Sequence, residues 1–280
     1  HPSPDCRIAR MMDENARPGA LERGAVLVTG AAQRLGREIA LGLARAGHDI
    51  VVHFNRSAEA AAATVADVEA LGRRAVAVGG DLADAGGRAR IFSEAVAALP
   101  VRGLVNNASL FEFDRPDAFE AATLERHLGP NLVAPIDLAR RLHDHVGAKG
   151  RGFVVNLLDQ KLENLNPDFF SYTVSKFGLL GATRMMAVGC APRLRVAAVS
   201  PGITLASGGQ TEAEFETAHR LTPLGRSSTP DDIVRAVVFL AESPAITGIN
   251  LIVDGGQHLV PLARDVMFVA PQPPADGPTN

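Results

Sequence analysis

The sequence has no tryptophan, one tyrosine and only three lysines among 280 residues. The tyrosine is Tyr172, and the lysines are Lys149, Lys161 and Lys176. Chemistry that needs a phenol therefore has a single candidate. The remaining basic residues are arginines, and the formal net charge is -3 at pH 7. Because a basic excess is what displaces counterions from nucleic acid, this balance argues against nonspecific nucleic-acid binding.

Cysteine and long apolar runs are also scarce. Cys6 and Cys190 lie far apart and lack Cys or His partners at zinc-ligand spacing, so we expect free thiols in a reducing compartment. No apolar run approaches the roughly 18 residues that span a bilayer, and no signal-peptide pattern is recognisable. His143, Asp144 and His145 are adjacent, but positions i and i+2 of a helix do not converge on one ion. We predict a cytoplasmic protein without membrane association or a metal.

What the sequence does contain is an alternation of buried runs and amphipathic stretches. The predicted strands are Ala25–Thr29, Asp49–Phe54, Ala75–Gly79, Gly103–Asn107, Gly152–Leu158, Arg195–Ser200 and Asn250–Val253. The clearest predicted helices are Leu35–Ala46, Ala58–Leu71, Arg88–Leu99 and Asp168–Val188. Strands that are apolar on both faces need helices on both sides, and the alternation requires right-handed crossovers. The pattern predicts an α/β, single-domain, Rossmann-type fold: a doubly wound parallel sheet of about seven strands with helices on both faces.

This domain is predicted over residues 24–260. Residues 1–23 are rich in Pro, Arg and Asp and predict a flexible tail, and residues 261–280 form a Pro-rich C-terminal extension with a disordered tip. The extension has apolar residues that could dock on a neighbouring subunit, namely Val266, Phe268 and Val269. The segment Gly202–Pro223, with a short helical piece from Glu212 to Ala218, follows the sixth strand and is placed to cover a ligand.

A glycine-bearing turn follows the first strand, where ligands of such a sheet bind. Gly30 and Gly36 flank it, and Arg34 and Leu35 lie just before Gly36. Such a turn lets backbone N–H groups at a helix N-terminus approach a pyrophosphate. Arg34 stands where the middle glycine of the usual three would be. Two glycines alone are also compatible with a purely structural turn.

The end of the second strand indicates which dinucleotide is bound. NAD enzymes place an acidic residue there for the ribose 2′-hydroxyl, whereas NADP enzymes place a cation. Here the turn contains His53, Arg56 and Ser57 and no carboxylate. These side chains can donate hydrogen bonds to a 2′-phosphate, although Ser57 could instead cap the following helix. The turn favours NADP(H) over NAD.

Tyr172 and Lys176 are four residues apart in a predicted helix and therefore share one face. A phenol has a pKa near 10 and is a poor acid–base group at neutral pH. A neighbouring ammonium that lowers this pKa by about 3 would supply about 4 kcal/mol in favour of the phenolate. Such a tyrosine could deliver a proton to an atom that receives hydride. Taken alone, the pair could also be a packed tyrosine beside a solvated lysine.

Together these features resemble the short-chain dehydrogenase/reductase family. The motifs that carry the resemblance are Thr29-Gly30 with Gly36, Asn106-Asn107-Ala108, Tyr172 with Lys176, and Pro201-Gly202. The resemblance implies that Tyr172 is the proton donor, that Lys176 binds the nicotinamide ribose and acidifies Tyr172, and that Asn131 continues a proton relay through water. It further implies a homotetramer. The cofactor-binding residues it implies, beyond those of the two turns, are Asp81, Leu82, Asn107, Ala108, Ser109, Pro201 and Gly202.

One position departs from the family pattern. The catalytic serine usual in the family lies thirteen residues before the tyrosine, and this chain has Asp159 there. An ionised carboxylate would repel the negative charge that develops on a carbonyl oxygen, and it has no proton to donate. Either burial keeps Asp159 protonated, or the substrate presents N–H donors. Both alternatives favour a nitrogen heterocycle over a simple ketone.

Within the family, the sequence is most similar to pteridine reductases and dihydromonapterin reductases. The similarity rests on Arg34-Leu35-Gly36, on the His53, Arg56 and Ser57 turn, and on Asp159. It implies that Arg34, Ser109 and Phe111 contact the substrate, with an aromatic ring stacked on the pterin, and that Phe169 is a further aromatic contact. Phe111 could equally be a plain core residue.

The leading hypothesis is NADPH-dependent reduction of a dihydropterin or similar heterocycle, with Tyr172, Lys176, Asp159 and Asn131 as the catalytic set. One alternative is a carbonyl reductase acting on a 3-oxoacyl, sugar or small ketone substrate. The other is a non-catalytic NADP-binding regulator, because a fold does not fix a function.

Overall fold

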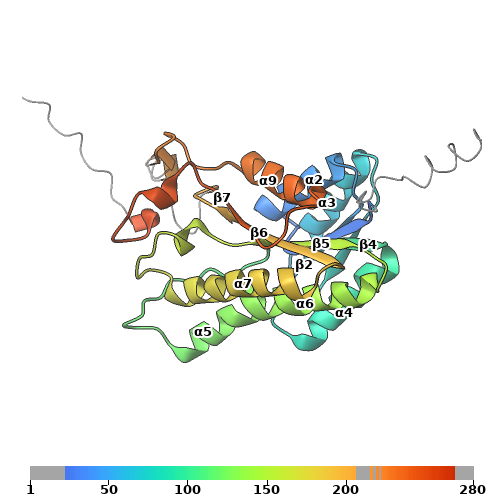
Figure 1. The fold of residues 1–280 in the computed structure, drawn as a ribbon, viewed down its shortest axis with the longest axis horizontal. Coiled ribbons are helices and arrows are strands. Elements are labelled where there is room, and N and C mark those ends of the chain that lie inside the picture. The colour runs from blue at the N-terminus through green and yellow to red at the C-terminus, as the bar shows by residue number, and fades with distance from the viewer. Residues whose placement is uncertain (1–22, 206–214, 217–218, 221, 269–280) are drawn as a thin grey trace, which may run out of the picture.

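A computed structural model describes residues 23–205, 215–216, 219–220 and 222–268. Its centre is one parallel sheet in the order β3-β2-β1-β4-β5-β6-β7 (Figure 1). The strands are β1 (Ala25–Val28), β2 (Ile50–Phe54), β3 (Ala75–Gly79), β4 (Val101–Asn106), β5 (Gly152–Leu157), β6 (Leu194–Pro201) and β7 (Asn250–Val253). The predicted seven-stranded, Rossmann-type sheet is confirmed, and every predicted strand lies within two residues of its observed bounds.

Helices cover both faces of this sheet. They are α2 (Arg34–Arg45), α3 (Ala58–Ala70), α4 (Ala85–Ala98), α5 (Ala121–Leu128), α6 (Ala134–Val146), α7 (Phe170–Gly189) and α9 (Pro230–Glu242). On one face α2, α3 and α9 bury residues such as Ile39 and Val237 against the strands. On the other face, α4 and α6 bury Ile91 and Leu138, and α7 lies beside them (Figure 1). The two layers explain why the strands are apolar on both sides.

The order of the strands places the site. The chain runs outward from β1 to β3 and then returns to β4 on the other side of β1. At this reversal the connecting helices diverge, and a crevice opens beyond the carboxyl ends of β1 and β4. The turns after β1, β2, β4, β5 and β6, where the candidate residues were predicted, therefore meet along one edge.

Some predictions concern residues that the structure does not describe. The predicted tail, which contains Cys6, lies outside the described residues except for Arg23. The tip of the C-terminal extension with Val269 and most of the helical piece from Glu212 to Ala218 also lie outside them. Within the described ranges, no helix combines the length and hydropathy that a bilayer span needs. The described residues also contain no group of His, Cys, Asp and Glu arranged to hold a metal.

Candidate active site

The turn after β1 is built for close backbone approach. Gly30 has a φ of +63°, and a Cβ added there would lie 3.2 Å from Ala108. A Cβ at Gly36 would lie 2.2 Å from the Gly30 carbonyl oxygen. Arg34 also adopts the left-handed region, with a φ of 54°, at a cost of about 1 kcal/mol for a residue with a Cβ. The chain thus keeps, at Arg34, the conformation that a middle glycine would adopt freely.

His53 supports this turn instead of facing solvent. Its Nδ1 accepts a hydrogen bond from the Gly30 N–H at 3.1 Å, so its Nε2 donates to the Gly80 carbonyl at 3.0 Å. The ring is buried, and burial lowers its pKa. The prediction that His53 donates to a 2′-phosphate is therefore wrong, because its one N–H is already used inside the fold.

Asn107 links the end of β4 to the same turn. Its side-chain amide donates to the carbonyl of Thr29 at 3.0 Å, and the backbone N–H groups of Asn107 and Ala108 both donate to Thr29 Oγ1 at 3.0 Å. These bonds hold the two strand ends together where the crevice opens.

The turn after β2 leaves its candidate residues accessible. Arg56 is exposed and Ser57 is half-buried. Ser57 is the residue before α3, yet in the described chain its side chain makes no capping hydrogen bond, so the capping alternative is not realised. After β3, the exposed Asp81 accepts a hydrogen bond from the Ala83 N–H at 2.8 Å, and Leu82 is buried.

A pocket of about 320 Å³ opens along this edge of the sheet. It is lined by Arg34, Leu35, Asn107, Ser109, Phe111, Leu157, Leu158, Asp159, Gln160, Lys161, Tyr172, Lys176, Pro201, Gly202, Ile203, Thr204, Leu205, Gln257, Asp265, Val266 and Met267. The structure therefore brings ten predicted residues to one cavity. Asn131 and Phe169 lie behind this lining and support it through the contacts given below. The residues predicted around the adenine ribose, such as Arg56 and Asp81, lie outside it.

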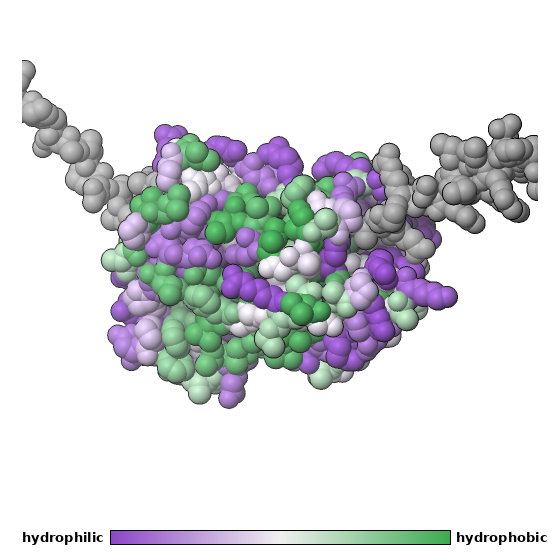
Figure 2. Space-filling model, in the orientation of Figure 1, coloured by the Kyte–Doolittle hydropathy of each residue, from purple (hydrophilic) through white to green (hydrophobic). Residues whose placement is uncertain are grey.

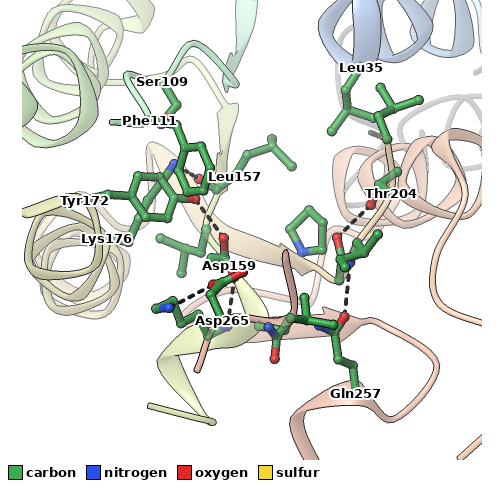
Figure 3. A pocket seen from close by; sticks show the side chains of 18 of the residues that line it. Leu35, Ser109, Phe111, Leu157, Asp159, Tyr172, Lys176, Thr204, Gln257 and Asp265 are labelled. Carbon is green, nitrogen blue, oxygen red and sulfur yellow. Dashed lines mark hydrogen bonds and ion pairs between the residues drawn. The ribbon is translucent and has the colours of Figure 1, made fainter. Parts of the chain in front are cut away.

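Tyr172, Asp159 and Lys176 form the polar centre of the pocket (Figure 3). The Tyr172 hydroxyl donates to Asp159 Oδ2 at 2.8 Å. The Lys176 Nζ donates to the Leu157 carbonyl at 2.7 Å and lies 5.5 Å from the centre of the Tyr172 ring. Asp159 Oδ1 accepts from the Lys161 N–H at 2.8 Å, which fixes the carboxyl at the end of β5. The phenol and the ammonium thus share one cleft, as the i,i+4 spacing predicts.

The protonation states differ from the expectation. Burial and the neighbouring Asp159 raise the pKa of Tyr172 well above its usual value. The acidification of the phenol expected from Lys176 is not found in this geometry, because burial and Asp159 act on its pKa in the opposite direction. Burial lowers the pKa of Lys176 to about 8, and burial raises the pKa of Asp159. The site favours the neutral phenol and a carboxyl that holds a proton more readily than usual.

Asn131 occupies a single π-helical turn, η1 (Gly129–Val133), between α5 and α6. π-Helical turns are often found at functional sites. Its Oδ1 accepts from the Leu110 N–H at 2.7 Å and from Ser109 Oγ at 3.2 Å. Its Nδ2 donates to the Leu110 carbonyl at 2.9 Å and to Ser175 Oγ at 3.0 Å. These four bonds fill the side chain's capacity, so a relay through this amide would have to break one of them.

Aromatic rings form one wall of the site. Phe111 is 40% exposed, which rules out the plain core alternative. Its ring stacks on Phe169 at 4.1 Å between centroids and meets the Tyr172 ring edge-on at 4.7 Å. Phe169 is buried and also stacks on Phe268 at 6.0 Å. Val266 is buried within this chain, whereas Phe268 stacks on Phe169 and is still 44% exposed. Docking of this segment on another subunit therefore stays a prediction.

Sequence reasoning missed the second charged pair at the pocket. Lys161 Nζ donates to Asp265 Oδ2 at 2.8 Å, and both residues line the cavity. The sequence could have identified Lys161 as a site residue, because it is one of three lysines and lies two residues after Asp159. It gave no reason to select Asp265, because this residue was predicted to lie in a loosely structured extension.

Comparisons with known proteins agree with this geometry. A sequence profile of the family described as Enoyl-(Acyl carrier protein) reductase matches residues 30–258. The structure of FolM Alternative dihydrofolate reductase 1 from Brucella canis, complexed with NADP, superposes with a TM-score of 0.82 at 38% identity, covering 88% of this chain and 97% of that one. The corresponding Brucella suis structure, also with NADP, gives a TM-score of 0.81 at 39% identity over 84% of this chain and 95% of that one.

Another relative has a name that points to a sugar substrate, unlike the two Brucella dihydrofolate reductases. L-rhamnose 1-dehydrogenase (NAD(P)(+)) of Sphingomonas sp. (strain SKA58) is 30% identical over 85% of this chain and 98% of its own length. The profile and this relative both span most of the sequence. The chain therefore belongs to the short-chain dehydrogenase/reductase family of oxidoreductases.

Proposed function

We propose that this protein is an NADPH-dependent reductase of a dihydropterin or a related nitrogen heterocycle. The observation that carries the proposal is the carboxyl of Asp159, hydrogen-bonded to the Tyr172 hydroxyl at 2.8 Å in the pocket. Burial raises the pKa of this carboxyl, so it can keep a proton for a ring nitrogen. The likeness to the two Brucella dihydrofolate reductases supports the same substrate class.

The glycine turn fits a dinucleotide. An added Cβ at Gly30 would lie 3.2 Å from Ala108 and one at Gly36 would clash with the Gly30 carbonyl, so the two glycines let this turn pack closely against its neighbours. The backbone N–H groups at the start of α2 can then face the crevice, where they would bind a pyrophosphate. Arg56 and Ser57 would hold the 2′-phosphate, and Lys176 would hold the nicotinamide ribose. When bound, NADPH supplies the hydride that the reaction requires.

The proton that the reaction also requires would come from side chains of this protein. Reduction of a C=N bond adds hydride to carbon and one proton to nitrogen. Tyr172 remains protonated because its pKa is raised, so it is a proton donor and not a base in the reductive direction. Asp159, which accepts the Tyr172 hydrogen bond, can pass a proton on or hold an N–H of the ring. Phe111 offers an exposed ring face at the pocket for stacking.

A substrate screen tests the proposal. Purified protein would be assayed for NADPH oxidation with several dihydropterins, 3-oxoacyl thioesters, sugars and small ketones. Turnover of at least one dihydropterin is expected, and its loss in Asp159→Ser is expected to be large. No NADPH oxidation with any dihydropterin would refute the proposed substrate class.

Carbonyl reduction is the second candidate, and the likeness to L-rhamnose 1-dehydrogenase favours it. It makes the opposite prediction for the same variant. Asp159→Ser places a hydroxyl where a carbonyl oxygen needs a donor. Activity on a sugar or ketone that survives or rises in this variant would support the second candidate over the first.

We also propose a homotetramer assembled through α5, α6 and α7. Hydrophobic surface gathers over α5 and α7 (Figure 2), where Phe177, Met185 and Val188 are 39%, 76% and 81% exposed. Apolar side chains exposed along one helix are typical of an interface. A measured mass in solution of one chain would contradict the tetramer.

A further inference from the structure

Lys161 is a buried cation that the proposed reaction does not use. It is 2% exposed, which is rare for lysine unless the ammonium is paired. The partner is Asp265, 104 residues later in the chain, at 2.8 Å, and Nζ also donates to Asn166 Oδ1 at 2.5 Å. A bond over this sequence distance fixes the C-terminal segment against the residues that follow β5.

Further contacts hold the segment 261–268 in place. The Arg264 Nε donates to the fully buried Asp168 at 2.7 Å, and the backbone N–H of Asp265 donates to the same carboxylate at 2.8 Å. Phe268 stacks on Phe169. Asp265 is therefore positioned from both sides.

Asp265 faces the pocket beside Asp159 (Figure 3). A carboxylate has about four lone-pair positions. In Asp265, Oδ2 accepts from Lys161 and Oδ1 accepts from the Met267 N–H at 3.1 Å, which leaves acceptor capacity at a side chain that is 14% exposed. The paired ammonium balances its charge, so a second carboxylate can be kept in a partly enclosed cavity.

We propose that Asp265 is a specificity-determining residue that accepts hydrogen bonds from an N–H or O–H edge of the substrate, and that Lys161 is its positioning residue. The inference rests on the proposed substrate pocket but not on the pterin. For a dihydropterin the edge would be the N–H groups of the aminopyrimidine ring. For a sugar it would be a hydroxyl pair.

The test compares Asp265→Asn, Asp265→Glu and Lys161→Met with Asp144→Asn, which alters an exposed carboxylate on α6. Pterin affinity would be measured by fluorescence titration with NADP⁺ present, so that no hydride is available, in a chain without tryptophan. We expect Asp265→Asn and Lys161→Met to weaken pterin binding and raise KM about tenfold. NADPH affinity and kcat are expected to change less than about twofold, and Asp265→Glu to recover part of the loss.

Thermal unfolding identifies variants that fail to fold. If Asp265→Asn unfolds, Asp265→Glu decides, because it keeps the charge and moves the acceptor atoms. Unchanged pterin affinity and KM in a folded Asp265 variant would overturn the proposal, as would an equal loss with a ketone that has no N–H or O–H donor.

The outcome can be separated from that of the proposed function. If the wild-type protein turns over no dihydropterin, the same variants are compared on a hydroxylated and an unsubstituted ketone. If the wild type prefers the hydroxylated ketone and the Asp265 variants lose this preference, the inference is supported even though the protein does not reduce dihydropterins.

Discussion

The two halves of the cleft are constructed differently. The half around the β1 turn is made of backbone: Gly30 and Gly36 let the turn pack closely against neighbouring residues, and His53 and Asn107 hold it through hydrogen bonds to the main chain. The half around Tyr172 is made of titratable side chains. There a phenol, two carboxyls and two ammonium groups line one pocket.

Because the two halves of the cleft are built differently, they should tolerate different amino-acid substitutions. A backbone cradle fails when a side chain intrudes, whereas a cluster of buried charges fails when one member loses its partner or its proton. Substitutions in the first half should therefore act on cofactor binding and folding. Substitutions in the second half should act on turnover and its pH dependence.

The largest expected effect is that of Tyr172→Phe, which removes the only phenol. We expect kcat to fall about 10³-fold, because general acid catalysis by one side chain contributes about 10²–10⁴-fold. NADPH affinity should hardly change, since the ring remains. Steady-state kinetics and a cofactor titration measure both. Substantial turnover in this variant would show that Tyr172 is not the donor.

Gly36→Ala tests the backbone half. The added Cβ would lie 2.2 Å from the Gly30 carbonyl, and such overpacking costs about 1–3 kcal/mol of the free energy of unfolding. Gly86→Ala in α4 is the control, because Gly86 is exposed, lies outside the proposed interface, and its added Cβ would lie 3.2 Å from the exposed Asp84 side chain. Denaturant titration should show Gly36→Ala destabilised and Gly86→Ala little changed. Equal stability of the two variants would contradict the close approach.

The same contrast explains how much the sequence could predict. The strands and the glycine turn follow from local patterns, namely apolar runs and a residue type required by a left-handed φ. The pairing of Lys161 with Asp265 depends on where a distant segment packs, and no local pattern encodes it. The expected acidification of Tyr172 is not found because spacing along a helix locates Lys176 but does not show the burial of the hydroxyl or its hydrogen bond to Asp159, which both raise its pKa.

Arg56→Ala tests the other end of the cofactor half, where the turn after β2 is proposed to bind the 2′-phosphate. Loss of one exposed, charge-assisted contact to a 2′-phosphate should weaken NADPH binding about tenfold and leave NADH binding unchanged. Arg151→Ala, an exposed arginine before β5, is the control. The ratio of the two cofactor affinities is the readout. If the preference for NADPH over NADH is the same in Arg56→Ala as in the wild type, Arg56 does not bind the 2′-phosphate.

The smallest expected effect is on stability, and it tests the charged half directly. Burial raises the pKa of Asp159 above its value of 3.8 in the unfolded chain. Between these two values the folded state binds more protons than the unfolded state, so this carboxyl makes the protein less stable as pH rises through that window. Asp159→Asn keeps the shape but cannot ionise.

The variant should therefore match the wild type below about pH 4. At neutral pH it should be more stable by up to about 1 kcal/mol, a common size for single-site effects. Denaturant titrations across this range, with Asp144→Asn as the exposed control, measure the difference. A variant that loses its advantage as pH rises would mean that Asp159 is stabilised as a carboxylate, and the proton assigned to it in catalysis would have to come from Tyr172 alone.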